Sequence, residues 1–147
     1  MLLTGSSGGV GRVAASVVQA AGWSVQPFDL DEGLDLRDFD AVLAAAQDCD
    51  GVVHADAIAH DSAGNPADIV AANLLGTGHV LLAAEMVGVS RVVYFSSAQV
   101  FGFAEGEGEP LYLPADDEHP TRASRPYRMS KRSLKRCAPP GRSARAL

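Results

Sequence analysis

TGSSGGVG, residues 4–11, is the stretch of this 147-residue sequence that decides the fold. It follows a short apolar start, Leu2 and Leu3, and leads into a segment in which apolar residues recur at helical spacing until Gly22. A strand, a glycine-rich turn and a helix in this order are typical of a turn that binds the pyrophosphate of a dinucleotide. An ordinary strand-to-helix turn is the alternative, and the strand and helix around the motif make it the weaker one.

Each glycine of the turn has its own predicted task. Gly5 permits a tight turn off the first strand, and Gly8 lets the main chain approach the phosphates. Gly11 lets the helix pack close to the sheet while its N-terminus faces the phosphates. Together they predict a phosphate-binding turn.

The residue at the end of the next apolar run bears on the choice of cofactor. Asp29 lies where a carboxylate can bind the 2′-hydroxyl of a ribose, and it would repel a 2′-phosphate. The sequence therefore favours NAD over NADP. Arg12 and Arg37 lie near enough in sequence to weaken that preference.

Strands and helices alternate along the chain. We expect strands at residues 24–29, 33–36, 51–54 and 91–95, and helices at residues 9–22, 37–47 and 66–87. The stretch from Gly102 to Ser124 is rich in Gly, Pro, Asp and Glu and predicts a long loop. A last helix is expected from about Ser124 to just before Pro139. The alternation predicts an α/β fold with a Rossmann-type, doubly wound parallel sheet.

Composition limits the classes of function. The content of 47% hydrophobic and 20% charged residues is ordinary for one soluble domain of this length. We see no apolar run approaching the roughly 20 residues of a membrane helix, and no signal peptide, so we expect a cytoplasmic protein without a membrane partner. Cys49 and Cys137 lack metal-ligand spacing, and His60, His79 and His119 have no evident partner. Neither a metal site nor a disulfide is expected.

Acidic and basic residues are separated along the chain. All 18 acidic residues lie at or before Glu118, whereas nine of the 12 basic residues lie from Arg122 onward. The basic end lacks interleaved aromatic residues and any reader motif, and the acidic body would repel phosphate, so we expect no nucleic-acid partner. We interpret the basic end as a solvated helix face followed by a disordered tail at residues 138–147.

A second motif, YRMSK, occupies residues 127–131. It places Tyr127 and Lys131 four residues apart, on one face of a helix. Such a pair alone is more often a surface aromatic with a solvated neighbour, and Ser97 alone is more often a strand-end hydroxyl. Because all three occur in order behind a dinucleotide turn, the sequence favours a catalytic constellation.

These motifs together resemble the N-terminal part of an extended short-chain dehydrogenase/reductase, the NAD-dependent epimerase/dehydratase family. The similarity runs from Met1 to about Cys137 and includes VVHADA (52–57), the NLLGT segment from Asn73, RVVYFSSAQVFG (91–102) and LPADDEHP (113–120). It implies a Rossmann domain at residues 1–137 that is truncated before its last strand or strands and before a C-terminal substrate domain.

The resemblance implies an NAD-dependent epimerase, dehydratase or dehydrogenase that acts on a hydroxyl of a sugar, sugar nucleotide or sugar acid. Tyr127 would remove the hydroxyl proton while hydride passes to NAD, Lys131 would hold the ribose and favour the phenolate, and Ser97 would bond to the reacting oxygen. The implied cofactor-binding residues are Gly5, Ser7, Gly8, Gly9, Val10, Gly11, Asp29, Asp35, Leu36, His54, Ala55, Asn73, Tyr127 and Lys131.

Two positions depart from the family pattern. Asp56 stands where a small apolar residue is usual; a carboxylate facing the cofactor would weaken binding, whereas one facing water would not. His79 stands where asparagine is usual, on a helix that we expect to be half-buried.

The end of the sequence, CAPPGRSARAL (137–147), resembles a shifted reading frame or a truncated gene product. Two alternatives to an active enzyme therefore remain: a non-catalytic dinucleotide-binding remnant, and a half-enzyme completed by another chain. Without following strands, the strand at residues 91–95 would lie at or near a sheet edge, so self-association is expected.

Overall fold

Four parallel strands form the central sheet of the protein. A computed structural model describes residues 1–103, 108–116 and 118–135, without the side chains of residues 134 and 135. The strand order is β2-β1-β3-β4, with β1 at Leu2–Thr4, β2 at Gln26–Phe28, β3 at Gly51–His54 and β4 at Arg91–Tyr94. The order reverses between β1 and β3, which pair in parallel. Doubly wound sheets bind ligands at the carboxyl ends of the strands where such a reversal occurs.

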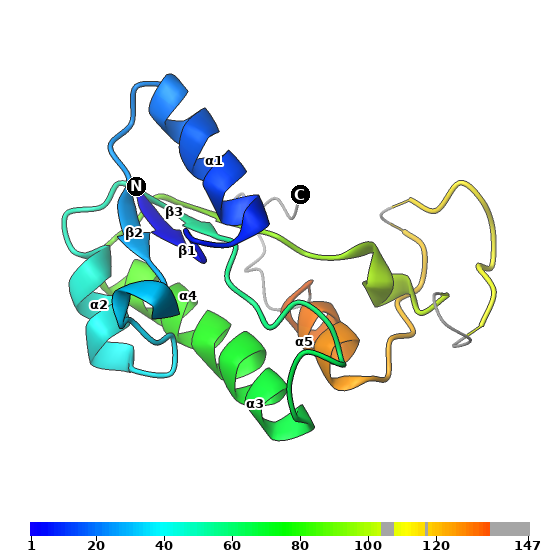
Figure 1. The fold of residues 1–147 in the computed structure, drawn as a ribbon. Coiled ribbons are helices and arrows are strands. Elements are labelled where there is room, and N and C mark those ends of the chain that lie inside the picture. Colours follow the sequence, from blue (N-terminus) through cyan, green and yellow to red (C-terminus); the bar gives the residue numbers. More distant parts are fainter. Residues whose placement is uncertain (104–107, 117, 136–147) are drawn as a thin grey trace.

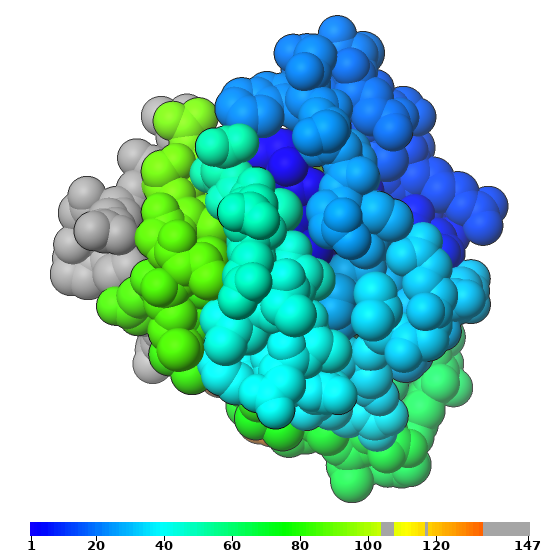
Figure 2. Space-filling model, turned by 90° about the vertical axis from the view of Figure 1, so that its left-hand side faces the viewer, coloured from blue at the N-terminus to red at the C-terminus, as the bar shows by residue number. Residues whose placement is uncertain are grey.

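Helices cover both faces of the sheet, which confirms the predicted doubly wound α/β fold (Figure 1). Helix α1 (Gly9–Ala20) lies on one side, and α2 (Phe39–Ala46), α3 (Pro66–Val70), α4 (Gly76–Met86) and α5 (Pro126–Lys135) lie on the other. The core between the sheet and α2 and α4 is apolar and fully buried, and includes Leu2, Phe28, Val42, Val52 and Val80. Figure 2 shows α2, in cyan, packed directly against α4, in green.

The prediction of a strand at residues 33–36 is wrong. The chain instead forms a 3₁₀ turn at Leu30–Glu32 and then passes Gly33, whose φ is +75°. The carbonyl of Asp29 accepts hydrogen bonds from the amides of Glu32 and Leu34, and the Asp29 side chain accepts one from Asp31. Because these bonds fold the chain back on itself, the segment does not extend alongside β2, and the described sheet ends there.

The long helix expected at residues 66–87 is present with a π-helical turn at Ala71–Leu75 between α3 and α4. By length and composition alone this helix, Pro66–Met86, could cross a membrane, which corrects our expectation that no run would be long enough. It lies instead along the sheet, in contact with α2, β3 and α5, and buries Ile69 and Val80. It therefore serves as a core helix of the domain.

The described parts of the expected loop, residues 102–124, contain neither helix nor strand, in agreement with the sequence. His119 is buried there, against the rings of Phe101, Phe103 and Tyr112. Its Nε2 accepts from the amide of Leu111 at 3.1 Å. His119 therefore holds this part of the loop together. The tail expected at residues 138–147 lies outside the described residues.

His60 and His79 also have partners in the structure. Nδ1 of His60 lies 3.0 Å from the Ser62 hydroxyl, and Nδ1 of His79 lies 2.8 Å from the carbonyl of Leu36. These hydrogen bonds do not test the expectation that the histidines bind no metal. The helix that carries His79 is half-buried, as expected: Thr77, Val80 and Ala83 are buried and His79 itself is partly exposed.

Candidate dinucleotide and catalytic site

The glycine turn leaves β1 where the strand order reverses. Gly5 has φ +71°, and a Cβ there would lie 2.6 Å from the amide nitrogen of Asp56. A Cβ on Gly11 would lie 1.9 Å from the carbonyl oxygen of Gly5. Gly5 therefore permits both the turn and the close approach of the segment after β3. Gly11 is required by contact with the turn itself rather than by packing of the helix on the sheet.

The N-terminus of α1 is open to an anion. Gly8, the N-cap residue, gives no side-chain cap, the first turn carries no acidic residue, and Gly9 has nothing within 4 Å of a Cβ position. The Ser6 hydroxyl is buried without a hydrogen-bond partner among the described residues. Amide groups at a helix N-terminus and an unsatisfied hydroxyl fit the pyrophosphate of a dinucleotide. Ser7 and Val10 belong to the same turn.

Asp29 lies beside this turn, as the sequence predicts. Its Oδ2 accepts from the amide of Ser7 at 3.0 Å, and its Oδ1 accepts from the amide of Asp31 at 3.1 Å. The carboxylate is thus held at the carboxyl end of β2, next to the phosphate turn. This position suits a bond to a ribose hydroxyl.

Asp35 is occupied by a neighbouring guanidinium. Arg37 donates from Nε to both Asp35 oxygens at 2.9 and 3.0 Å, and this ion pair lowers the pKa of Asp35. Arg37 is therefore engaged by Asp35, which reduces its availability for a 2′-phosphate. Leu36 is buried in the core.

His54 ends β3 in a buried row of polar side chains. The Thr77 hydroxyl donates to the carbonyl of Asn73 at 2.6 Å, so it accepts from Nε2 of His54 at 2.8 Å. Nδ1 of His54 then accepts from the Thr4 hydroxyl at 2.5 Å. Burial lowers the pKa of His54 to about 3, so the ring is neutral. Because both ring nitrogens of His54 already form hydrogen bonds within the protein, only its main chain is available to contact a cofactor.

Asn73 holds the segment that follows β3. From the π-helical turn, its Nδ2 donates to the carbonyl of Ile58 at 3.0 Å and its Oδ1 accepts from the amide of Ile58 at 2.8 Å. The amide of Ala55 donates to the carbonyl of Thr4. These bonds fix residues 55–58 beside the glycine turn, so Asn73 and Ala55 shape this wall of the site.

Tyr127 and Lys131 lie one turn apart in α5, and both are buried, with 8% and 3% of their surface exposed. Nζ of Lys131 donates to the carbonyl of Phe95 at 3.0 Å and lies 4.6 Å from the centre of the Tyr94 ring. Burial lowers the pKa of Lys131 to about 8, and the charge of Asp56 opposes this shift. The ammonium of Lys131 thus lies at the end of β4, at the carbonyl of Phe95, which precedes Ser97 by two residues.

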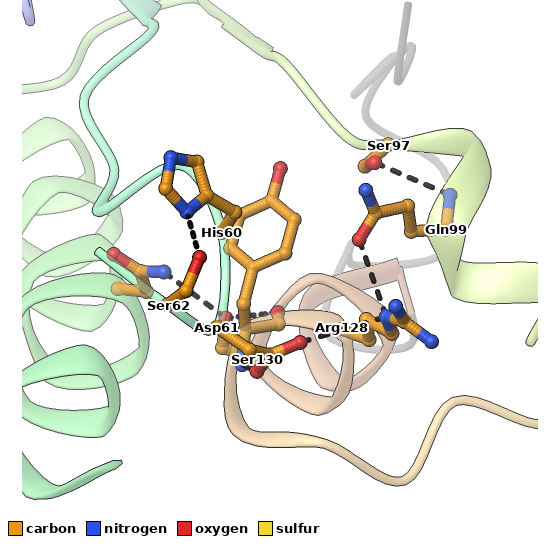
Figure 3. Close-up of polar contacts among 9 residues, drawn as sticks. His60, Asp61, Ser62, Ser97, Gln99, Arg128 and Ser130 are labelled. Atoms are coloured by element: carbon orange, nitrogen blue, oxygen red, sulfur yellow. Dashed lines mark hydrogen bonds and ion pairs between the residues drawn. The ribbon is translucent and has the colours of Figure 1, made fainter. Parts of the chain in front are cut away.

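Ser97 begins the 3₁₀ turn Ala98–Phe101, and its hydroxyl accepts from the amide of Gln99 at 3.2 Å. Within the described part of the chain, no hydrogen bond joins the side chains of Ser97, Tyr127 and Lys131. Tyr127 and Lys131 are brought together by their position in α5. Ser97 is connected to the same helix through Gln99, whose side chain accepts a hydrogen bond from Nε of Arg128 at 3.3 Å (Figure 3).

Asp56 is half-buried and lies near enough to Asp29 and Lys131 for their charges to act on its carboxyl. Burial raises the pKa of its carboxyl to about 6; the charge of Asp29 adds to this shift and that of Lys131 opposes it. Since these groups surround the expected cofactor position, Asp56 is the carboxylate that would oppose the pyrophosphate.

Asp61 and Arg128 form a buried connection that the sequence does not predict. Oδ2 of Asp61 lies 3.5 Å from Nε of Arg128, whose side chain is 1% exposed. Arg128 lies within YRMSK, so the motif contained a signal: a charged residue between two residues of a buried helix face. Its partner comes from a distant loop, and no local pattern marks it.

Fold and site together define a Rossmann domain with a dinucleotide turn, and the comparisons with known proteins agree. Residues 1–140 match the NAD dependent epimerase/dehydratase family. The chain belongs to this family.

The relatives include several sugar-active enzymes. The chain is 29% identical to uronate dehydrogenase from Pseudomonas syringae pv. tomato over 89% of its own length and 50% of the relative's. It is 31% identical to a putative UDP-glucose 4-epimerase from Methanocaldococcus jannaschii, over 70% and 30% of the two lengths. The chain spans half the length or less of these curated relatives.

Solved structures show the same fold. A short-chain dehydrogenase/reductase superfamily protein from Agrobacterium tumefaciens with bound NAD has a TM-score of 0.77 and 32% identity, covering 88% of this chain and 41% of its own. The UDP-glucose 4-epimerase of Thermus thermophilus, in complex with NAD, has a TM-score of 0.77 and 27% identity, covering 91% and 48%.

Proposed function

We propose that this chain is the NAD-binding and proton-transfer part of an oxidoreductase or epimerase acting on a hydroxyl of a sugar, sugar nucleotide or sugar acid. The observation that carries the proposal is the placement of Lys131 at the carbonyl of Phe95, just after β4, with Tyr127 buried one turn away on the same helix. The glycine turn of this fold lies at the strand reversal. The relatives that share the fold include a uronate dehydrogenase and UDP-glucose 4-epimerases.

In this proposal Lys131 acts twice, since it also holds the ribose of the cofactor. The ammonium of Lys131 favours the phenolate of Tyr127, which removes the proton of the substrate hydroxyl. The Ser97 hydroxyl bonds to the reacting oxygen. Bound NAD supplies the hydride acceptor, and the protein supplies position and electrostatics.

Cofactor choice is the first test. Because Asp29 presents a carboxylate and Arg37 is engaged by Asp35, NAD(H) is expected to bind more tightly than NADP(H) in calorimetric titrations. Equal or stronger binding of NADP(H) would exclude this part of the proposal.

A test of the proton transfer requires a form of the protein that turns over substrate. Fusion to the C-terminal half of a related enzyme is the form that we would assay, with sugars and uronic acids. Tyr127→Phe is expected to remove turnover and leave NAD affinity nearly unchanged, because only the proton transfer is lost. Substantial remaining turnover would show that Tyr127 is not the base.

A dinucleotide-binding module without turnover is the second candidate, because no hydrogen bond within the described residues joins the side chains of Ser97, Tyr127 and Lys131. Contacts that orient a substrate hydroxyl can account for roughly 7 to 11 kcal/mol of a barrier. An NAD-reduction assay on the 147-residue chain separates the two: bound NAD with no reduction favours the module.

A further inference from the structure

The helix that carries Tyr127 and Lys131 is joined to two loops by residues that the proposed function does not use. Asp61 lies in the segment between β3 and α3, and Gln99 lies in the 3₁₀ turn that follows Ser97. Arg128 of α5 lies between them: its Nε is 3.5 Å from Asp61 Oδ2 and donates to Gln99 Oε1 at 3.3 Å (Figure 3). Three segments that are distant in sequence thus meet on one guanidinium.

The first turn of α5 depends on an acceptor from outside the helix. The first amide groups of any helix lack partners within it. Pro126 has no amide hydrogen, and the side chain of Arg125, directly before the helix, carries only donors. The amide of Tyr127 donates instead to Oδ1 of Asp61 at 2.8 Å. Asp61 therefore caps the helix at the proposed base, with its negative charge at the favourable end of the helix dipole.

The two contacts of Asp61 support each other. The Arg128 side chain is 1% exposed and that of Asp61 is 18% exposed, so the pair is largely shielded from water. A buried guanidinium is costly without a charged partner, because its hydration is lost on burial. The bond from Arg128 to Gln99 then ties the same pair to the turn whose amide bonds to the Ser97 hydroxyl.

We propose that Asp61 is a positioning residue: it fixes the start of α5, and through Arg128 and Gln99 it sets Tyr127 against the turn that carries Ser97. Its importance for a reaction rests on the proposed function, in which Tyr127 is the base. The positioning itself does not require turnover, so it is measured independently of activity.

Amide hydrogen exchange followed by NMR tests the cap directly. Asp61→Ala removes both contacts, whereas Asp61→Asn keeps an oxygen that can accept from the Tyr127 amide. Exchange at Tyr127 is expected to accelerate about five- to tenfold in the alanine variant, the effect of losing one cap, and much less in the asparagine variant.

Asp38→Ala is the matched control, since the Asp38 side chain caps α2 through the amide of Ala41 at 3.1 Å. It removes an equivalent cap on a different helix, and it is expected to leave exchange at Tyr127 unchanged. Faster exchange at Tyr127 in this control as well would mean that the effect is general loss of stability, and would overturn the proposal.

The ring of Tyr127 gives a second readout in protein carrying labelled tyrosine. The sequence holds three tyrosines, and Tyr127→Phe identifies the signal. Asp61→Ala is expected to shift the Tyr127 ring signal and to leave that of the exposed Tyr112 in place. Wild-type exchange and ring signals in both Asp61 variants would refute the positioning role. NAD titration of the wild type tests the proposed function separately.

Discussion

Asp56 is the residue whose charge opposes the proposed cofactor. Its pKa is raised from 3.8 to about 6, so between these pH values the folded protein holds a proton that the unfolded chain has lost. The stability of the folded state therefore falls as the pH rises from about 4 to about 6, and this contribution is constant above that range. The main chain of Asp56 lies against Gly5 of the glycine turn, so at pH 8 we expect its negative charge to repel the pyrophosphate.

Asp56→Asn is expected to change stability and affinity in the same direction at pH 8. The free energy of unfolding of the variant, measured in urea, is expected to exceed that of the wild type by roughly 1 to 3 kcal/mol at pH 8. This gain is expected to vanish near pH 4, where the wild-type carboxyl is protonated in the folded state. NAD is expected to bind about fivefold more tightly at pH 8, which corresponds to removal of about 1 kcal/mol of repulsion.

Asp50→Asn is the control for this effect, because Asp50 is exposed and precedes the opposite end of β3. It is expected to change neither quantity. An Asp56→Asn variant with wild-type affinity at both pH 8 and pH 5 would show that the carboxylate does not face the cofactor.

Gly11 is the second residue whose substitution gives a sharp test. A Cβ at Gly11 would lie 1.9 Å from the Gly5 carbonyl, whereas a Cβ at Gly9 meets nothing within 4 Å. Gly11→Ala is therefore expected to lower the free energy of unfolding by at least about 2 kcal/mol and to weaken NAD binding. Gly9→Ala, in the same helix turn, is expected to keep wild-type stability in urea unfolding. Equal losses in both variants would contradict the steric explanation.

At the scale of elements, the polar row across the sheet fixes how α4 meets β3. His54 donates to the Thr77 hydroxyl, and both side chains are buried. Thr77→Val keeps the shape of the side chain but leaves the imidazole N–H without an acceptor, which is expected to cost about 2 kcal/mol. Thr77→Ser keeps the hydroxyl and loses one methyl group, at a cost of about 0.8 kcal/mol. Thermal or urea unfolding measures both variants, and an equal loss of unfolding free energy in Thr77→Ser and Thr77→Val would refute the role of the hydrogen bond.

The elements also show what local sequence can predict. Strands β1, β3 and β4 and helix α1 follow from apolar periodicity and turn glycines, and these elements place the glycine turn. The false strand at residues 33–36 arose because its apolar residues fit a strand, while the bonds that bend the segment converge on Asp29, outside it. The cap on α5 was missed for the same kind of reason: Asp61 is 66 residues from Tyr127 in sequence, and only the folded chain brings them together.

At the scale of the whole molecule, the two faces of the sheet are covered unequally. On the side of α1, a groove of about 910 Å³ lies between that helix and strands β3 and β4, lined by residues that include Val53, Val93 and Phe95. Parallel sheets are normally buried on both faces. Among the described residues, β4 also has no strand beyond it, so its outer edge is free to pair.

The uncovered groove and free edge predict self-association of the 147-residue chain. Val13 and Val17 of α1 are 66% and 65% exposed at the groove, and contiguous apolar surface of this kind favours contact with another chain. The double variant Val13→Glu and Val17→Glu is expected to shift light scattering toward monomer, since glutamate at both positions must be desolvated in any such contact.

Ser16→Glu with Gln19→Glu is the control: it adds the same charge at exposed positions of α1 outside the groove lining, and is expected to associate like the wild type. A wild-type chain that is monodisperse and monomeric at every concentration would contradict the prediction, and equal association of both double variants would place the contact elsewhere.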